Sequence, residues 1–353
     1  MERQNYARYK TAMLVAAGLF AVWGVFGVFD VDNLPYAGYL TDGNNTVTQV
    51  REGSPAEQAG MQTGDYIRSI DGVAVEDAAA AARRPRPNIG ATRAFVVERE
   101  GQTANLDVTY ARLPGRNKAL TYAGILIGFC YLIFGLMPYL KTPSGRTMLL
   151  AIFGLTLGVS FFGGPYLSSY TLRTIRLLLT NLLVVGGFAS LLHFTLMFPK
   201  RKALLDKRHM RDLLYGPAAL VFLFLVYRGV FQPAATSTLN VITGVLIGLF
   251  ILGYFGLSLA AFVHSYVKAT AQERRVQGLT YVLAGVLVGF LPVLFVVLVG
   301  LVAPQVVIPG GNFFFLTLVL IPISLALAVM KTEKTESSVS VFNEAQPHVS
   351  LST

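Results

Sequence analysis

Few side chains in this 353-residue chain have the types and spacing that catalysis requires. The four histidines do not form the His-Glu-x-x-His string with which a helix holds zinc and positions a base. No pair of carboxylates lies in an apolar run to support an aspartyl mechanism, and no serine has a motif that would supply an activating base. The sequence therefore predicts a non-enzymatic protein with no metal site and no cofactor.

The carboxylates are unevenly placed along the chain. Twelve of the 19 acidic residues lie within residues 30–118, and the six beyond residue 118 are expected in loops or in the C-terminal tail. Because a carboxylate inside the membrane is the usual mark of a proton or cation relay, this distribution argues against an ion-coupled transporter. The six are Asp206, Asp212, Glu273, Glu333, Glu336 and Glu344.

The composition indicates a membrane protein. Hydrophobic residues make up 54% of the chain and charged residues only 14%, whereas charged residues approach a quarter of a soluble domain. Eight apolar runs have the roughly 20 residues needed to cross a bilayer. These runs cover about 11–29, 119–140, 148–168, 177–198, 213–231, 240–267, 278–302 and 312–330. We expect a mainly α-helical membrane protein with one helix, an insert, and then a seven-helix membrane domain over residues 119–330.

The net charge of +10 comes from basic residues that favour one side of the predicted membrane. If the N-terminus is cytoplasmic, 16 of the 29 Lys and Arg fall in cytoplasmic segments and three in short outer loops, while ten lie within residues 51–118. By the positive-inside rule, both termini are expected in the cytoplasm and the insert outside. Topology thus accounts for the positive charge, and no nucleic-acid partner is expected.

Residues 1–29 are predicted to form a cytoplasmic N-terminus and an uncleaved membrane anchor. The apolar run of about 19 residues exceeds the roughly 7 to 15 of a signal-peptide core, and no small-x-small cleavage site follows it.

The insert, residues 30–118, has the pattern of a small α+β domain. Alternating segments with strand character lie at 47–50, 66–70, 94–98 and 106–109, between Gly-, Asn- and Asp-rich turns. Residues 76–84 have helical composition, and Pro85 ends this stretch. At the sequence GSPAEQAGM, residues 53–61, Ser54 can cap a short helix that begins at Pro55 and ends at Gly60.

These motifs together resemble the core of a bacterial PDZ domain. The resemblance rests on GSPAEQAGM, on GDYI and IDGV at residues 64–67 and 70–73, and on residues 89–108, which are similar to the final hairpin of these domains. It implies that the insert binds an extended peptide or an extracytoplasmic protein segment by adding a strand to a sheet edge, with loop amides holding a carboxylate. The positions that match the binding loop and strand are Tyr36, Ala37, Gly38, Tyr39, Leu40 and Thr41. Two features depart from the pattern: Ala37 is small, and DGNN at 42–45 shortens the strand.

The membrane domain carries landmarks that resemble the membrane input region of bacterial sensors, including competence quorum-sensing histidine kinases. The landmarks are HFTLMFP at 193–199, Arg-x-Gln at 275–277, and IPIS at 321–324. By this resemblance the protein would lie in the bacterial inner membrane as a multi-pass protein that relays a signal. The candidate relay residues are His193, Pro199, Arg275, Gln277, Pro292 and Pro322. Packing is the more common role of a histidine in the place of His193, and the two later prolines could equally be fixed kinks.

The segment 331–353 is polar, without a periodic apolar face, and is predicted to be a disordered cytoplasmic tail. The sensors continue at this point into a kinase that the segment does not resemble, so a separate cytoplasmic signalling protein is the expected partner. The favoured hypothesis is a membrane sensor or adaptor in which the PDZ-like domain binds a peptide and the bundle relays the event. The alternative is a transport or lipid-handling protein whose PDZ-like domain shapes an outer vestibule.

Overall fold

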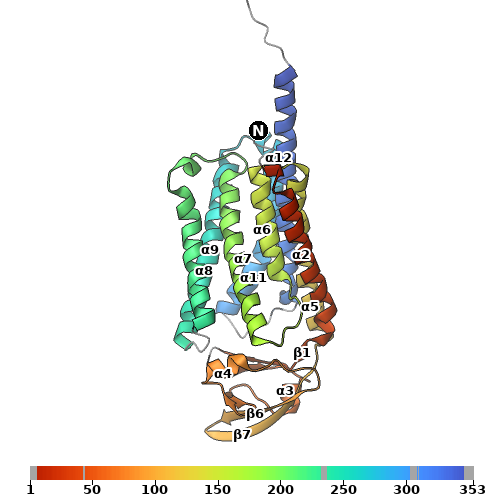
Figure 1. Cartoon of the computed structure of the whole chain (residues 1–353), viewed down its shortest axis with the longest axis vertical. Helices are drawn as coiled ribbons and strands as arrows, with labels where there is room; N and C mark the ends of the chain where they lie inside the picture. Colours follow the sequence, from red (N-terminus) through yellow and green to blue (C-terminus); the bar gives the residue numbers. More distant parts are fainter. Residues whose placement is uncertain (1–5, 43, 232–236, 303–307, 309, 346–353) are drawn as a thin grey trace, which may run out of the picture.

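The computed structural model describes residues 6–42, 44–231, 237–302, 308 and 310–345. These residues form a bundle of long helices with a smaller β-rich unit at one end (Figure 1). The start of α2 and the C-terminal half of α12 lie at the opposite end of the bundle (Figure 1). We call the end that carries the β-rich unit the sheet end and the opposite one the remote end.

The bundle helices run along the long axis of the molecule and pack closely where small residues meet (Figure 1). They are α2 (Lys10–Asp30), α5 (Gly115–Lys141), α6 (Gly145–Phe161), α7 (Tyr170–Met197), α8 (Met210–Phe231), α9 (Ser237–Lys268), α11 (Leu279–Val302) and α12 (Leu320–Ala345). Shorter pieces are η1 (Val31–Asn33), η2 (Ala203–Asp206), α10 (Ala271–Val276) and η3 (Gly311–Val319). At the α5–α6 contact, a Cβ on Gly154 would overlap the Tyr131 carbonyl oxygen, so glycine permits the close approach of the two backbones.

Seven of the described helical segments are long and apolar enough to cross a membrane, and α6 is a shorter apolar helix. The structure thus differs from the predicted eight spans at residues 148–168. With 17 residues, α6 rises about 25 Å, less than the roughly 30 Å hydrocarbon thickness. The helix ends at Phe161 because Gly163, Gly164 and Pro165 follow, and none of the three favours continuation of a helix.

The β-rich unit lies between α2 and α5. Its described strands are β1 (Pro35–Tyr36), β2 (Tyr39–Thr41), β3 (Val47–Val50), β4 (Tyr66–Ile70), β5 (Val73–Ala74), β6 (Thr92–Arg99), β7 (Gln102–Thr109) and β8 (Ala111–Arg112), with helices α3 (Pro55–Gln58) and α4 (Ala78–Arg83). An antiparallel sheet has the order β5-β4-β6-β7, while β2 pairs with β3 and β1 with β8. Strands β3 and β4 coincide with two predicted strands, and β6 and β7 contain the other two.

Local chemistry explains why the β-rich unit folds where the sequence predicted. The Ser54 side chain accepts a hydrogen bond from the Glu57 amide at the start of α3, with Pro55 in the first helical position. Asp71 and Gly72 join β4 to β5 with positive φ angles of 52° and 73°, as a two-residue hairpin turn requires. The sheet and α3 enclose a core in which Phe95, Val97 and Val108 are fully buried.

The chain enters and leaves the β-rich unit side by side. Strand β1 follows α2 and η1, strand β8 precedes α5, and the two strands pair through Pro35 with Arg112 and Tyr36 with Ala111. An ion pair between Lys118 and Asp32 adds a second link between these connections. The β-rich unit is therefore tied to two bundle helices at once.

The predicted disordered tail is wrong for residues 331–345, which continue α12 as a helix. The first turns of this extension gain tertiary partners that composition does not reveal: Thr332 and Glu333 are buried, and Glu333 and Glu336 both contact Arg146 of α6. Residues 346–353 of that predicted tail and residues 1–5 of the N-terminal segment lie outside the described residues.

Candidate functional site

The predicted binding loop rests on the N-terminal end of α3. Gly38 has φ +88°, and a Cβ there would overlap the Ser54 Cβ, so only glycine fits. The Gly38 carbonyl accepts from the Arg51 amide (2.8 Å), and the buried Ala37 carbonyl accepts from the Ala56 amide (2.9 Å). Among the described residues, the amide N–H groups of Ala37 and Gly38 have no acceptor. Two adjacent free amides on a fixed loop can donate to a carboxylate.

Strand β2 offers an open edge next to this loop. Tyr39, Leu40 and Thr41 pair with β3, and no other described strand pairs with β2. The Leu40 side chain is 49% exposed. As predicted, the strand is short: the Asp42 carboxylate accepts from the amides of Asn44 (2.8 Å) and Thr46 (2.9 Å) and turns the chain after three strand residues.

Tyr39 and Tyr36 connect the open edge to different parts of the β-rich unit. The Tyr39 ring packs edge-on against Phe95, with centroids 5.7 Å apart. Burial raises the pKa of Tyr39 far above its usual value, so the phenol stays neutral. Tyr36 is half-buried and belongs to β1, and its hydroxyl lies 3.0 Å from the position that a Cβ on Gly38 would take.

Hydrogen bonds to main-chain carbonyls join α4 and the following loop to the bundle at the sheet end. Arg173 of α7 donates to the carbonyls of Ala82 and Arg84, both at 3.0 Å. The Tyr166 hydroxyl donates to the Pro87 carbonyl at 2.6 Å. The Arg86 guanidinium lies over the Tyr166 ring, 5.7 Å from its centroid. The β-rich unit is thus oriented on the bundle by a set of defined polar contacts.

Two guanidinium nitrogens at this junction are incompletely bonded. The Nε atoms of Arg84 and Arg173 are buried without a hydrogen-bond partner among the described residues. Burial is the main cause, and repulsion from Arg93 the second cause, of the lowered pKa of Arg84. A junction that leaves buried donors unsatisfied is less stable than one in which every donor is paired.

The predicted relay residues fall at separate places in the bundle. His193 Nδ1 lies 2.9 Å from the Tyr215 hydroxyl and joins α7 to α8. Pro292 lies within α11, whereas Pro322 is buried in the first turn of α12, directly after the 3₁₀ segment η3. A change from 3₁₀ to α-helix at Leu320 precedes Pro322, and such changes often mark hinges.

At the remote end, the structure brings together two of these residues. Pro199 and Gln277 line one pocket between the turn after α7 and the start of α11. Arg275 is exposed, and its carbonyl accepts from the Lys331 ammonium at 2.7 Å. Two of the landmark sequences therefore meet through Pro199 and Gln277, and Arg275 contacts α12 at Lys331, beyond the IPIS landmark.

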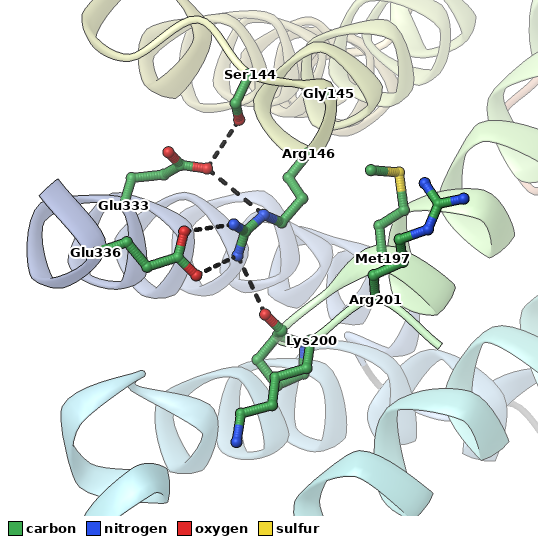
Figure 2. A pocket seen from close by; sticks show the side chains of 9 residues that line it. Ser144, Gly145, Arg146, Met197, Lys200, Arg201, Glu333 and Glu336 are labelled. Atoms are coloured by element: carbon green, nitrogen blue, oxygen red, sulfur yellow. Dashed lines mark hydrogen bonds and ion pairs between the residues drawn. The ribbon is translucent and has the colours of Figure 1, made fainter. Parts of the chain in front are cut away.

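A cluster centred on Arg146 closes the same end, and Figure 2 shows its side chains around a cavity of about 440 Å³. The guanidinium contacts Glu336 in a bidentate manner (3.0 and 2.5 Å), Glu333 (3.6 Å) and the Pro199 carbonyl (3.1 Å). The Ser144 hydroxyl donates to Glu333 at 2.8 Å. Arg146 thereby joins the start of α6, the extension of α12 and the turn after α7.

No sequence pattern indicated this cluster, because Glu333 lies in a polar segment that was predicted to be a disordered tail. The Glu333 residue is only 3% exposed. The spacing of local motifs could not reveal the contact, since Ser144 and Glu333 are 189 positions apart. Capping did offer a partial indication: Ser144-x-x-Thr147 forms a capping box that fixes where α6, and hence Arg146, begins.

Two further observations bear on the chemistry of the bundle. Within the described residues, no group of three or more His, Cys, Asp or Glu side chains is arranged to hold a metal ion. A crevice among α7, α9, α11 and α12 is lined by apolar side chains such as Leu191, Phe255 and Ile321 and holds about 30 Å³. That volume is far below the roughly 300 Å³ at which ligand pockets begin.

Comparison with known proteins identifies the β-rich unit. Residues 46–88 match the PDZ domain family model, while the predicted binding residues 36–41 lie just before the matched segment. No curated protein matches the chain. The resemblance of the bundle to sensor-kinase input regions stays a prediction, because the family match covers the β-rich unit alone. The chain therefore contains a PDZ domain, which suggests binding of peptides or protein segments, attached to apolar helices consistent with a multi-pass membrane protein.

Proposed function

We propose that the protein is a non-enzymatic membrane sensor or adaptor. Its PDZ domain binds an extended peptide or protein segment along β2, and the helix bundle conveys this event to a cytoplasmic signalling protein at the remote end. The main support for peptide binding is the open β2 edge beside the free amides of Ala37 and Gly38. A peptide bound along β2 forms main-chain hydrogen bonds with this strand, and its terminal carboxylate accepts hydrogen bonds from the two amides.

Contacts within the PDZ domain and between this domain and α7 support the relay. Tyr39 of β2 packs against Phe95 in the core of the domain, and the carbonyls of Ala82 and Arg84 accept from Arg173 of α7. Helix α7 ends at the remote end, directly before the Pro199 turn that contacts Arg146. Displacement of the α4 region by a peptide would act on Arg173 first, and α7 spans the distance between the two ends.

The distribution of basic residues supports the orientation. Sixteen Lys and Arg would lie on the side of the remote end and three in the short loops at the sheet end. The positive-inside rule then puts the remote end in the cytoplasm and the PDZ domain outside a bacterial inner membrane. In this orientation the end of α12, which projects beyond the bundle in Figure 1, would be accessible to a cytoplasmic partner.

Peptide capture by the full-length protein in lipid nanodiscs tests the proposal. The probe is a library of random seven-residue peptides with free C-terminal carboxylates, beside the same library with amidated ends. We expect capture of the free-carboxylate library. Leu40→Glu should weaken capture about 10-fold or more, because a carboxylate on the exposed β2 edge repels the incoming carboxylate and resists desolvation.

Thr103→Glu is the matched control, since Thr103 is exposed on β7 at the other side of the sheet. It should leave capture unchanged. No capture above background by the wild-type protein, or equal loss in the two variants, would contradict peptide binding at β2.

The transport alternative requires a continuous polar cavity through the bundle. The crevice among α7, α9, α11 and α12 is apolar and about 30 Å³ in volume, so this observation favours the sensor hypothesis.

A further inference from the structure

A second pocket at the remote end lies beside the Arg146 cluster, between the turn after α7 and the C-terminal end of α9. Its volume is about 260 Å³. Helices α7 and α9 both end here, at Met197 and Lys268, where two of the candidate membrane spans also end. The pocket therefore opens at the boundary between apolar helix surface and polar connections.

The side chains that line the pocket carry more positive than negative charge. Lys200, Arg201, Lys202 and Lys268 contribute four cations, and Glu273 contributes the one carboxylate among its lining residues. Lys200 is paired with Glu273 at 2.6 Å, and Arg201 is paired with Asp206, outside the lining, at 2.8 Å. In the part of the chain that the structure describes, no carboxylate lies within ion-pair distance of Lys202 or Lys268.

Lys202 is held in place by side chains of α9. Its ammonium donates to the Ser265 hydroxyl at 2.6 Å and lies 3.4 Å from His264 Nδ1. Partial burial is the main cause, and repulsion from Lys268 the second cause, of a lowered pKa of Lys202. An ammonium has three donors, so one remains for a ligand after these two contacts. A bound anion would relieve both the desolvation and the repulsion between the lysines.

The carbonyl ends of α7 and α9 attract cations and could by themselves explain lysines at this position. However, the α9 carbonyls already have a cation. Arg274 donates to the carbonyls of Tyr266 (2.9 Å) and Val267 (3.2 Å), and its guanidinium lies 4.5 Å from the centroid of the Tyr266 ring. The ammonium of Lys202 instead turns to side chains inside the pocket. Helix-end compensation therefore does not explain why the Lys202 ammonium points into the pocket.

The neighbouring cavity in Figure 2 provides an internal comparison. There Glu333 and Glu336 face Arg146, so the central cation of that cavity has carboxylate partners. The two cavities share Pro199, Lys200 and Arg201. The 260 Å³ pocket, which we call the lysine pocket after Lys202 and Lys268, has only one carboxylate, that of Glu273, among its lining residues.

We propose that the lysine pocket binds a phosphate group, supplied by the headgroup of an anionic phospholipid or by a soluble phosphate. Phosphate offers several acceptor oxygens to converging N–H donors, and basic pockets between membrane helices on the cytoplasmic side are suited to anionic headgroups. The cavity is smaller than the roughly 300 to 1,000 Å³ of pockets for drug-sized ligands, which fits a headgroup better than a large solute. This site is independent of peptide binding at the PDZ domain.

Native mass spectrometry of the full-length protein in detergent tests the proposal. Phosphatidylglycerol, phosphatidylcholine and inorganic phosphate are titrated separately. We expect saturable binding of one phosphatidylglycerol or of inorganic phosphate, and no comparable binding of phosphatidylcholine, whose headgroup carries no net charge. Preference for the lipid identifies a headgroup site, and binding of inorganic phosphate with equal affinity identifies a soluble ligand.

The variant Lys202→Gln/Lys268→Gln should weaken this binding about 10-fold or more, because two charge-assisted hydrogen bonds are lost. The matched control is Lys207→Gln/Arg208→Gln, which removes the same charge from exposed positions on the connection between α7 and α8 and should change binding by less than about twofold. The single variant Lys268→Gln changes an exposed side chain and is therefore not expected to affect folding. It should weaken binding while the melting temperature stays unchanged, which separates loss of the site from loss of the fold. Absence of saturable binding to both anionic probes, or equal loss in the two double variants, would overturn the proposal.

Discussion

The two ends of the helix bundle are held together by different chemistry. At the sheet end, Arg173 and Tyr166 donate to neutral carbonyls of the PDZ domain, and the Nε atoms of Arg84 and Arg173 stay unsatisfied among the described residues. At the remote end, Arg146 meets two carboxylates, one of them nearly inaccessible to solvent. Charged pairs give stronger hydrogen bonds than neutral acceptors do.

This difference suggests a division of roles. Apart from the Lys118–Asp32 ion pair at the strand connections, the contacts described at the sheet end use neutral acceptors and leave two donors unsatisfied. Such contacts can rearrange at low cost, as a domain that responds to peptide binding requires. A cluster built from paired charges favours one arrangement, and its opening would be a discrete event. Each prediction below weakens one end, in order of decreasing expected effect.

Removal of Arg146 should cause the largest loss. Arg146→Met removes a cation that contacts the buried Glu333, which we expect to lower the free energy of unfolding by about 4 kcal/mol. Chemical denaturation of the full chain in detergent measures the effect. Arg201→Met removes an exposed ion pair and should change stability by less than about 1 kcal/mol. The double variant Arg146→Met/Glu333→Met should recover part of the loss, and equal effects of the two single variants would contradict a special role for the cluster.

Substitution of Gly38 tests the predicted binding loop. Gly38→Ala forces a side chain into the Ser54 Cβ at a positive φ angle, and should destabilise the PDZ domain by about 3 kcal/mol. Gly101→Ala also places a side chain at positive φ, but nothing lies within 4 Å of the added Cβ, so only about 1 kcal/mol is expected. Hydrogen exchange at core strands β6 and β7 measures both. Equal losses of stability in Gly38→Ala and Gly101→Ala would show that the contact with Ser54 adds nothing to the effect of the substitution.

As the pH is lowered, the PDZ domain should lose stability before its hydrogen bonds to the bundle are affected, because those bonds join Arg173 and Tyr166 to neutral carbonyls. Burial alone would raise the pKa of Asp65, but hydrogen bonds from Arg99 and from the Gln62 amide outweigh it, and the pKa falls below its usual value. Stability from this bidentate pair is therefore fully present above about pH 4 and is lost as the pH falls through the lowered pKa. We expect a loss of about 2 kcal/mol.

Hydrogen exchange of the PDZ amides as a function of pH measures this loss. Asp65→Asn should remove the acid dependence and lower stability at neutral pH, whereas Asp107→Asn, at an exposed position of β7, should retain the dependence. An unchanged pH profile in Asp65→Asn would assign the effect to other groups.

Arg173→Ala should have the smallest effect on stability but a clear effect on geometry. The loss of two hydrogen bonds to carbonyls weakens the junction by about 1.5 kcal/mol. Spin labels at Thr103→Cys and Leu182→Cys, with Cys130→Ala, should give a broader distance distribution between the PDZ domain and α7. Arg176→Ala is the control, because Arg176 donates to the Gly163 carbonyl within the bundle. Identical distributions in both variants would mean that Arg173 does not orient the domain.

The sequence predicted the PDZ region well because its structure depends on local chemistry. Ser54, Pro55, Asp71 and Gly72 specify a helix start and a hairpin turn within a few residues. The remote end depends on contacts between residues far apart in the chain, such as Ser144 with Glu333, which no local pattern reveals. The helical extension of α12 was missed for the same reason, since its polar residues gain their stability from Arg146.

Hydrogen exchange at the remote end of the full-length protein tests most directly whether the two ends are coupled. Exchange is followed in residues 199–202 and 331–336 of the wild type, Arg173→Ala and Arg176→Ala. If the bundle relays the position of the PDZ domain, Arg173→Ala alters exchange in both segments and Arg176→Ala does not. Unchanged exchange in both segments of Arg173→Ala, together with a loosened PDZ domain in the spin-label experiment, would contradict the relay.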